Sequence, residues 1–117
     1  FGKEPALWSD QLKGHERIRC IVNYLTRMRL TDAEGRLEYS FKDALDDPMP
    51  EGFKPWFEFE SLAAQSHQIL FGHWAALNGK TISDRIQNVD GGCVWGNQLM
   101  AFRLEDQQMF AVDNPVI

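Results

Sequence analysis

The sequence predicts a mixed α+β fold in which a helical segment comes first and a short-stranded sheet follows. Three observations predict it: apolar residues at helical spacing in the first quarter, alternating apolar and polar residues near residue 40, and a hairpin pattern near the end. The chain has 117 residues, of which 44% are hydrophobic. It is therefore long enough for one domain with a modest core.

The clearest predicted element is an amphipathic helix over residues 14–28. Apolar residues recur there at steps of three and four, namely Ile18, Ile21, Val22, Leu25 and Met28. Ser9 or Asp10 is expected to cap the turn before this helix.

The strand signals are shorter. Residues 31–35 predict a turn in which Gly35 takes a positive φ, and the alternation over 37–41 predicts a half-buried strand. Residues 43–54 are rich in acids, proline and glycine, which predicts an exposed connection. In the second half we expect strands at 69–71 and 85–90. An antiparallel hairpin is expected to pair 99–104 with 108–112.

Charge and cysteine content exclude several classes of protein. The net charge of −5 argues against a general nucleic-acid surface, so a polyanionic substrate would have to meet local positive groups. Cys20 and Cys93 form neither a metal-binding pair nor a disulfide scaffold, which favours reduced thiols in a cytoplasmic protein. No apolar run is long enough to cross a membrane.

The most informative motif is Phe71-Gly72-His73-Trp74, followed some twenty residues later by Asp90-Gly91-Gly92-Cys93-Val94-Trp95-Gly96-Asn97. A histidine placed where a buried strand ends in a glycine turn can present a ring nitrogen to a cleft. By itself, however, such a histidine is more often structural than a ligand. His15 and His67 have no partners at ligand spacing and are interpreted as structural.

Gly79-Lys80-Thr81 looks like a phosphate-binding motif but does not qualify as one. A phosphate-binding loop of this type needs another glycine five residues before Gly79, and Trp74 occupies that position. We therefore expect a solvent-exposed turn.

Four segments, in order, carry a family resemblance: residues 1–10, 17–29, 54–57 and 68–97. They resemble the bacterial symmetrical diadenosine tetraphosphate hydrolases, which are calcineurin-like metallophosphoesterases. The metal-binding motifs Gly-Asp-x-His-Gly, Gly-Asp-x-x-x-x-Arg-Gly and Gly-Asn-His of that superfamily do not occur here. The resemblance therefore implies that residues 1–117 are the C-terminal portion of one α/β domain, a four-layer α/β/β/α sandwich. Residues 1–67 would form its helical and hairpin segment, and 68–117 its last strands with the Gly-His motif.

The resemblance also implies a chemistry: symmetrical cleavage of diadenosine tetraphosphate into two ADP by a two-metal mechanism. The cofactors would be two divalent transition-metal ions of the Mn or Co type. His73 would be one metal ligand, and most of the others would lie on the missing N-terminal half. Arg27 would stabilise charge on the phosphoryl group. From residue type and position, Arg29 and Lys54 would bind substrate phosphates. Trp8, Trp56, Trp74 and Trp95 are of a type most often found in the core or at its rim, but one or two would stack on an adenine base, and Trp56, beside Lys54 and Pro55 after an exposed loop, is the better candidate.

Alternatives remain at this point. Cationic side chains at a helix end also complement the helix dipole, which would explain Arg27 and Arg29 without a ligand. The parent protein could be a serine/threonine phosphatase-like phosphoesterase, or the chain a noncatalytic interaction module. We also expect the chain to associate with the missing half, or with itself, because a divided sandwich leaves apolar surface uncovered.

Overall fold

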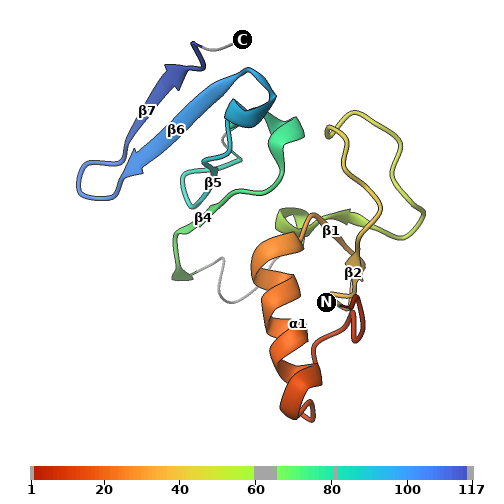
Figure 1. Cartoon of the computed structure of the whole chain (residues 1–117). Helices are drawn as coiled ribbons and strands as arrows, with labels where there is room; N and C mark the ends of the chain where they lie inside the picture. The colour runs from red at the N-terminus through yellow and green to blue at the C-terminus, as the bar shows by residue number, and fades with distance from the viewer. Residues whose placement is uncertain (1, 60–65, 81, 116–117) are drawn as a thin grey trace. The chain divides into compact units, whose positions relative to one another are not determined.

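The computed structural model describes residues 2–59, 66–80 and 82–115, which fall into two compact units. Unit 1 is Phe1–Phe59 and unit 2 is Glu60–Ile117. Figure 1 shows a helix followed by short strands along the chain. Among the described residues, the strand pairs are antiparallel except for β4 with β5. The predicted mixed fold with mostly antiparallel short strands is confirmed.

Unit 1 begins with an irregular segment that turns between Ser9 and Leu12 and leads into helix α1, Gly14–Arg27. The predicted helix is confirmed to within one residue, since Met28 is already extended at φ −68° and ψ 128°. The turn before the helix is capped by Ser9, whose Oγ accepts a hydrogen bond from the N–H of Gln11 at 3.1 Å. Ser9 thus takes the capping role expected of Ser9 or Asp10.

The buried face of α1 is not the apolar one that the spacing predicts. Cys20 and Asn23 are fully buried, and the Nδ2 of Asn23 donates to the carbonyl of Gly2 at 3.1 Å. Ile18 and Leu25 are 57% and 80% exposed. The helix is therefore held to its unit partly by hydrogen bonds, and an apolar stripe faces outward.

Three two-residue strands form the sheet of unit 1: β1 (Leu30–Thr31), β2 (Leu37–Glu38) and β3 (Lys54–Pro55). β1 lies in the middle, with Leu30 opposite Glu38 on one side and opposite Pro55 on the other. The predicted turn over 31–35 joins β1 to β2, and Gly35 has the expected positive φ of 95°. That prediction is confirmed.

The strand predicted over 37–41 pairs only at its start. The Glu38 carboxylate accepts hydrogen bonds from the backbone N–H groups of Ser40 and Phe41, each at 2.9 Å, and this local bonding competes with strand pairing. Burial alone would raise the pKa of Glu38, but the hydrogen bonds from Ser40 and Phe41 lower it. Leu37 and Phe41 are nevertheless buried, as the alternation predicts.

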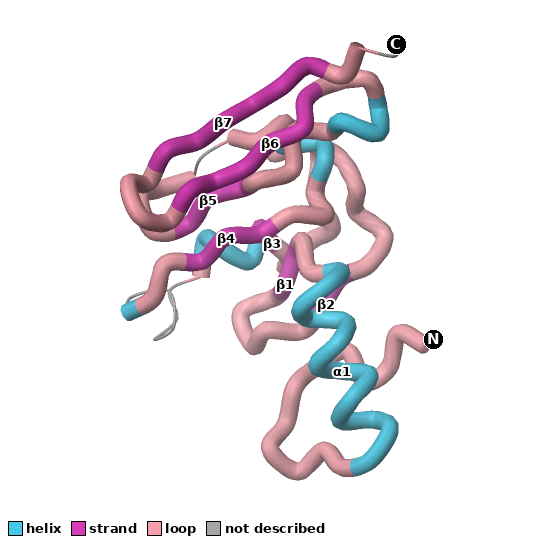
Figure 2. Tube along the Cα trace, turned by 60° about the vertical axis from the view of Figure 1, so that its left-hand side comes forward, coloured by secondary structure: helices cyan, strands magenta, loops and turns pink. Residues whose placement is uncertain are grey.

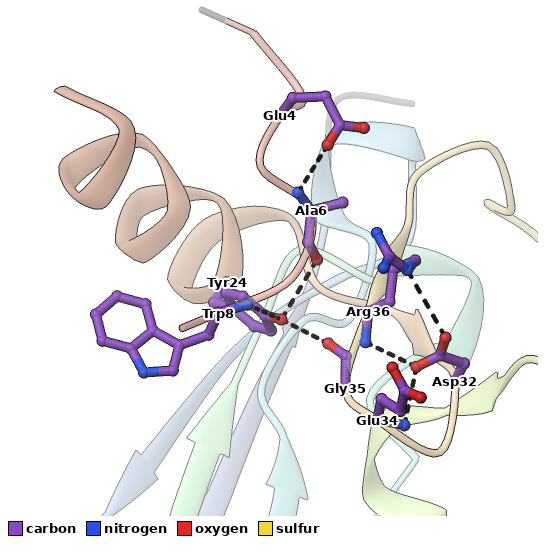
Figure 3. Close-up of polar contacts among 8 residues, drawn as sticks. All are labelled: Glu4, Ala6, Trp8, Tyr24, Asp32, Glu34, Gly35 and Arg36. Atoms are coloured by element: carbon purple, nitrogen blue, oxygen red, sulfur yellow. Dashed lines mark hydrogen bonds and ion pairs between the residues drawn. The ribbon is translucent and has the colours of Figure 1, made fainter. Parts of the chain in front are cut away.

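The hydroxyl of Tyr24 joins the three parts of unit 1 (Figure 3). It accepts a hydrogen bond from the N–H of Trp8 at 3.1 Å, and its oxygen lies 2.5 Å from the carbonyl of Gly35 and 3.3 Å from that of Ala6. A hydroxyl has one hydrogen, so it donates mainly to the nearer carbonyl, that of Gly35. Burial raises the pKa of Tyr24. The helix, the N-terminal segment and the β1–β2 turn thus meet at one oxygen.

Unit 2 contains two strand pairs, of which only the second was predicted as a pair. β4 (Ile69–Phe71) and β5 (Ile86–Asn88) run parallel, with Ile69 opposite Ile86. β6 (Gln98–Arg103) and β7 (Gln108–Asp113) form the predicted antiparallel hairpin, visible as a two-stranded ribbon in Figure 2. The strand predicted at 69–71 and the hairpin are confirmed, whereas the strand predicted at 85–90 forms only over Ile86–Asn88.

The backbone conformation and the packing of Gly79 explain the glycine in Gly79-Lys80-Thr81. Its φ is 71°, and a Cβ at this position would collide with the sulfur of Met100. Packing and backbone conformation therefore account for the glycine, in a turn whose Lys80 is exposed. Thr81 lies outside the described residues.

Two further observations concern the cysteines and the helices. Cys20 and Cys93 are both free thiols, and burial raises the pKa of Cys20. Within residues 2–59, 66–80 and 82–115, no helix has the length and apolar content needed to cross a bilayer.

Tyr24→Phe tests the joint at the tyrosine hydroxyl. It leaves the Trp8 N–H and the Gly35 carbonyl without their partner, so unit 1 should lose about 1 kcal/mol or more of stability. Amide hydrogen exchange should show faster opening of unit 1 and loss of protection at Trp8. Tyr39→Phe is the matched control, because it removes a hydroxyl that donates to the carbonyl of Lys3 at 3.0 Å and does not bond to Trp8 or Gly35. Equal losses in the two variants would contradict the assignment.

Candidate functional site

The predicted site residues fall in both units. His73 lies in unit 2, while unit 1 holds Arg27, Arg29, Lys54 and Trp56. Each group is built by the elements of its own unit.

His73 follows directly from the parallel pairing of β4 with β5. The N–H of Val89 donates to the carbonyl of Phe71 at 2.8 Å, which continues the pairing to the carboxyl end of both strands. The chain then turns at His73, which has a positive φ of 69°, uncommon for a residue other than glycine. Its side chain is exposed, whereas that of the next residue, Trp74, is fully buried. The imidazole thus stands at the strand end, on a backbone anchored by a buried tryptophan.

Asp90 lies at the carboxyl end of β5, beside the Gly72-His73 turn. A Cβ at Gly72 would lie 3.9 Å from the Cβ of Asp90, so the backbone of Gly72 passes close to this side chain. The Oδ1 of Asp90 accepts a hydrogen bond from the N–H of Gly92 at 3.0 Å. Its own N–H donates to the Oδ1 of the fully buried Asn88 at 2.9 Å. These bonds hold the carboxylate in place next to the turn.

Asp90 belongs to the motif of residues 90–97, but the sequence alone indicates no role for it. Its position beside Gly72 depends on the register of β4 and β5, which the sequence alone does not fix. The available signal was that Gly72-His73 and Asp90 each follow a predicted strand, since parallel strands bring such ends together.

The turns that follow His73 and Asp90 are joined. The Nδ2 of Asn97 donates to the Oδ1 of Asn78 at 3.2 Å. A Cβ at Gly92, which has a φ of 72°, would lie 3.8 Å from the carbonyl oxygen of Ala75. We call residues 72–78 and 90–97 the corner of unit 2. The corner is one connected structure at the carboxyl ends of β4 and β5.

The corner fits a metal ion only in part. A neutral imidazole is a common metal ligand, and that of His73 is accessible from solvent. However, in the described part of the chain no three His, Cys, Asp or Glu side chains converge to hold a metal. A metal at His73 would thus need ligands from elsewhere.

In unit 1, Arg27 is the last residue of α1. Its guanidinium carbon lies 4.6 Å from the centroid of the Tyr39 ring, and its Nη1 donates to the Oδ1 of Asn23 at 3.4 Å. An open hollow of about 430 Å³ lies along this end of the helix, lined by Val22, Asn23, Thr26 and Arg27. The side chain is therefore held by an aromatic ring at the edge of a surface hollow.

Arg29 lies between α1 and β1 and is half-buried. Its Nη1 donates to the carbonyl of Phe41 at 3.4 Å, and its buried Nε has no hydrogen-bond partner in the described part of the chain. Burial, and next the charge of Arg27, lower the pKa of Arg29. Within the described residues, neither arginine forms an ion pair. Two neighbouring cations without a bonded carboxylate suit an anionic ligand.

Lys54 and Trp56 are brought close to Arg29 by strand β3. Lys54 pairs with Thr31 and is exposed, and the N–H of Trp56 donates to the carbonyl of Arg29 at 2.9 Å. The half-buried Trp56 ring packs edge-on against Phe57 at 5.6 Å between centroids. The structure thus brings Arg29, Lys54 and Trp56 to adjoining backbone segments.

Comparison with known proteins gives the family context. No family model matches the chain. Over 111 residues it is 47% identical to the symmetrical bis(5'-nucleosyl)-tetraphosphatase of Marinomonas sp. (strain MWYL1), an alignment that covers 95% of this chain and 40% of that protein. The resemblance to the symmetrical tetraphosphatases is confirmed. The tetraphosphatases of Legionella pneumophila (strain Corby) and Coxiella burnetii (strain Dugway 5J108-111) are 47% and 41% identical over 112 residues. Each alignment covers 96% of this chain and 40% or 38% of the relative.

The chain thus spans about 40% of the length of these tetraphosphatases. Its similarity to them runs through both units rather than through one motif, because the alignments cover nearly the whole chain.

Proposed function

We propose that this chain is part of a symmetrical dinucleoside tetraphosphate hydrolase that cleaves diadenosine tetraphosphate into two ADP. The observation that carries the proposal is 41–47% identity, over nearly the whole chain, to proteins named for that activity. The exposed imidazole of His73 at a strand end and the arginine pair of unit 1 support it.

The proposal extends to architecture. In it, both units contribute to one α/β/β/α sandwich, as the C-terminal portion of a metallophosphoesterase domain. Such a sandwich combines parallel and antiparallel strand pairs. Unit 2 has one pair of each kind, the parallel β4–β5 pair and the antiparallel β6–β7 hairpin.

His73 is the proposed metal ligand of this chain, and the remaining ligands would come from outside it. When bound, two divalent ions of the Mn or Co type would lower the pKa of a water molecule and neutralise negative charge on the phosphates. The contribution of the chain is to hold the imidazole. It does so through the buried Trp74 and the joined turns of the corner, which fix the backbone that carries the ring.

The arginines of unit 1 are proposed to act on the polyphosphate. Arg27 would stabilise the negative charge that develops on the transferred phosphoryl group, as a preorganised cation held against Tyr39. Arg29 and Lys54 would bind the neighbouring phosphates, and Trp56 would contact a nucleobase. Phosphate oxygens would give the half-buried Arg29 guanidinium partners that suit its fixed fork of donors.

A chimaera tests the proposal directly. In it, this chain replaces the 111 aligned residues of the Marinomonas relative, which supplies the rest of the enzyme. We expect the chimaera to convert diadenosine tetraphosphate into ADP alone when a divalent transition metal is added. Formation of AMP and ATP, or turnover of a phosphopeptide but not of the dinucleotide, would contradict the proposed activity.

His73→Ala in the chimaera should remove a metal ligand. We expect lower metal content and a loss of at least about 100-fold in turnover, since even residues that only support metal ligands contribute up to about that factor. Elemental analysis alongside the kinetics checks this. His15→Ala is the matched control, because His15 is an exposed histidine on α1 and should leave both quantities unchanged. Full metal content with normal turnover in His73→Ala would refute the ligand assignment.

Arg27→Ala should reduce turnover about 100-fold while leaving metal content intact, because it removes transition-state charge stabilisation and no metal ligand. Arg17→Ala is the matched control: Arg17 lies on the same helix and also stacks on an aromatic ring, that of Trp8, at 4.7 Å. If the two variants had similar kinetics, Arg27 would have only a structural role at the helix end.

A further inference from the structure

A large aromatic side chain stands exposed at the corner of unit 2. Trp95 is 79% exposed and its neighbour Val94 is 80% exposed, whereas Trp74 of the same corner is fully buried. Tryptophan offers a large flat apolar face, and exposing it costs free energy unless a ligand or partner covers it.

The turn that carries Trp95 is fixed. It is a short 3₁₀ helix, η3 (Cys93–Trp95), bounded by Gly92 and Gly96, which have φ values of 72° and 92°. The N–H of Trp95 donates to the carbonyl of Gly92 at 2.9 Å, and the side chain of Asn114 donates to the carbonyl of Cys93 at 2.7 Å. A preorganised platform loses little conformational entropy when a ligand covers it.

This turn is also tied to the segment that follows His73. The bond from Asn97 to Asn78 and the close approach of Gly92 to Ala75 join the two turns of the corner. Trp95 and the proposed metal ligand therefore belong to one connected structure. Whatever binds at His73 has an exposed indole in the same corner.

We propose that Trp95 stacks on a nucleobase of the bound nucleotide. The proposal rests on the proposed function and names the part of the substrate that this residue recognises. A base that stacks on an aromatic ring is held by its π face rather than by its edge, so adenine and guanine should bind comparably.

The test compares a ligand that has a base with one that lacks it. Binding of ADP and of inorganic pyrophosphate to the chimaera is measured by calorimetry, before and after Trp95→Ala. We expect ADP affinity to fall about tenfold, within the range that stacking of one base provides. Pyrophosphate affinity should stay within about twofold. Trp95→Phe should keep most of the ADP affinity because it retains an aromatic face.

Val94→Ala is the matched control, since it shortens an equally exposed apolar neighbour and should leave ADP binding unchanged. Unchanged ADP affinity in Trp95→Ala, or an equal loss for pyrophosphate, would overturn the proposal. A second measurement does not depend on any destabilised variant: ADP, but not pyrophosphate, should quench tryptophan fluorescence in the chimaera, and Trp95→Phe should abolish most of that quenching. Binding does not require turnover, so an inactive chimaera with Trp95-dependent ADP binding would refute hydrolysis and leave stacking in place.

Discussion

The parallel pairing of β4 with β5 is the constraint on which the candidate site depends. Parallel strands end at the same edge of a sheet, so the pairing brings Gly72-His73 and Asp90 together although they are seventeen residues apart or more. A register shift of one residue would move each strand side chain to the opposite face. The buried Trp74 anchors the carboxyl end of β4. The fully buried Asn88, at the carboxyl end of β5, holds the following turn by accepting a hydrogen bond from the N–H of Asp90. Packing thus fixes two exposed groups, an imidazole and an indole, in one corner.

In unit 1, hydrogen bonds position the candidate site residues. Helix α1 is attached through Asn23 and Tyr24, and this orientation turns Ile18 and Leu25 outward. The same orientation stacks Arg27 on Tyr39, beside Arg29. The pKa of Arg29 is lowered mainly by burial and also by the charge of Arg27. An anion would offset the repulsion between the two arginines and supply partners for the half-buried guanidinium of Arg29. The contacts that hold the helix therefore also create the proposed phosphate site.

The sequence predicted the elements whose apolar pattern is long or bounded by glycine. Helix α1 and both strands of the β6–β7 hairpin lie within one residue of their predicted bounds, β4 lies at 69–71 as predicted, and β5 occupies the middle of the predicted 85–90. Strands β1 and β3 were not predicted because two residues show no periodicity, and β3 contains Pro55, which is tolerated on an edge strand. The buried face of α1 was mispredicted because it is attached by polar groups, which a hydrophobicity pattern does not count. His73 was predicted from its motif, whereas the position of Asp90 beside it required the strand register.

The proposed chemistry depends most directly on the binding of a metal ion by His73. Anomalous diffraction from crystals of the manganese-loaded chimaera measures this, because it locates each ion independently of the protein chain. We predict a ring nitrogen of His73 at roughly 2 Å from one ion, the distance typical of imidazole bound to a divalent transition metal. An ion fully coordinated by other residues, with the His73 ring turned away from it, would contradict the account.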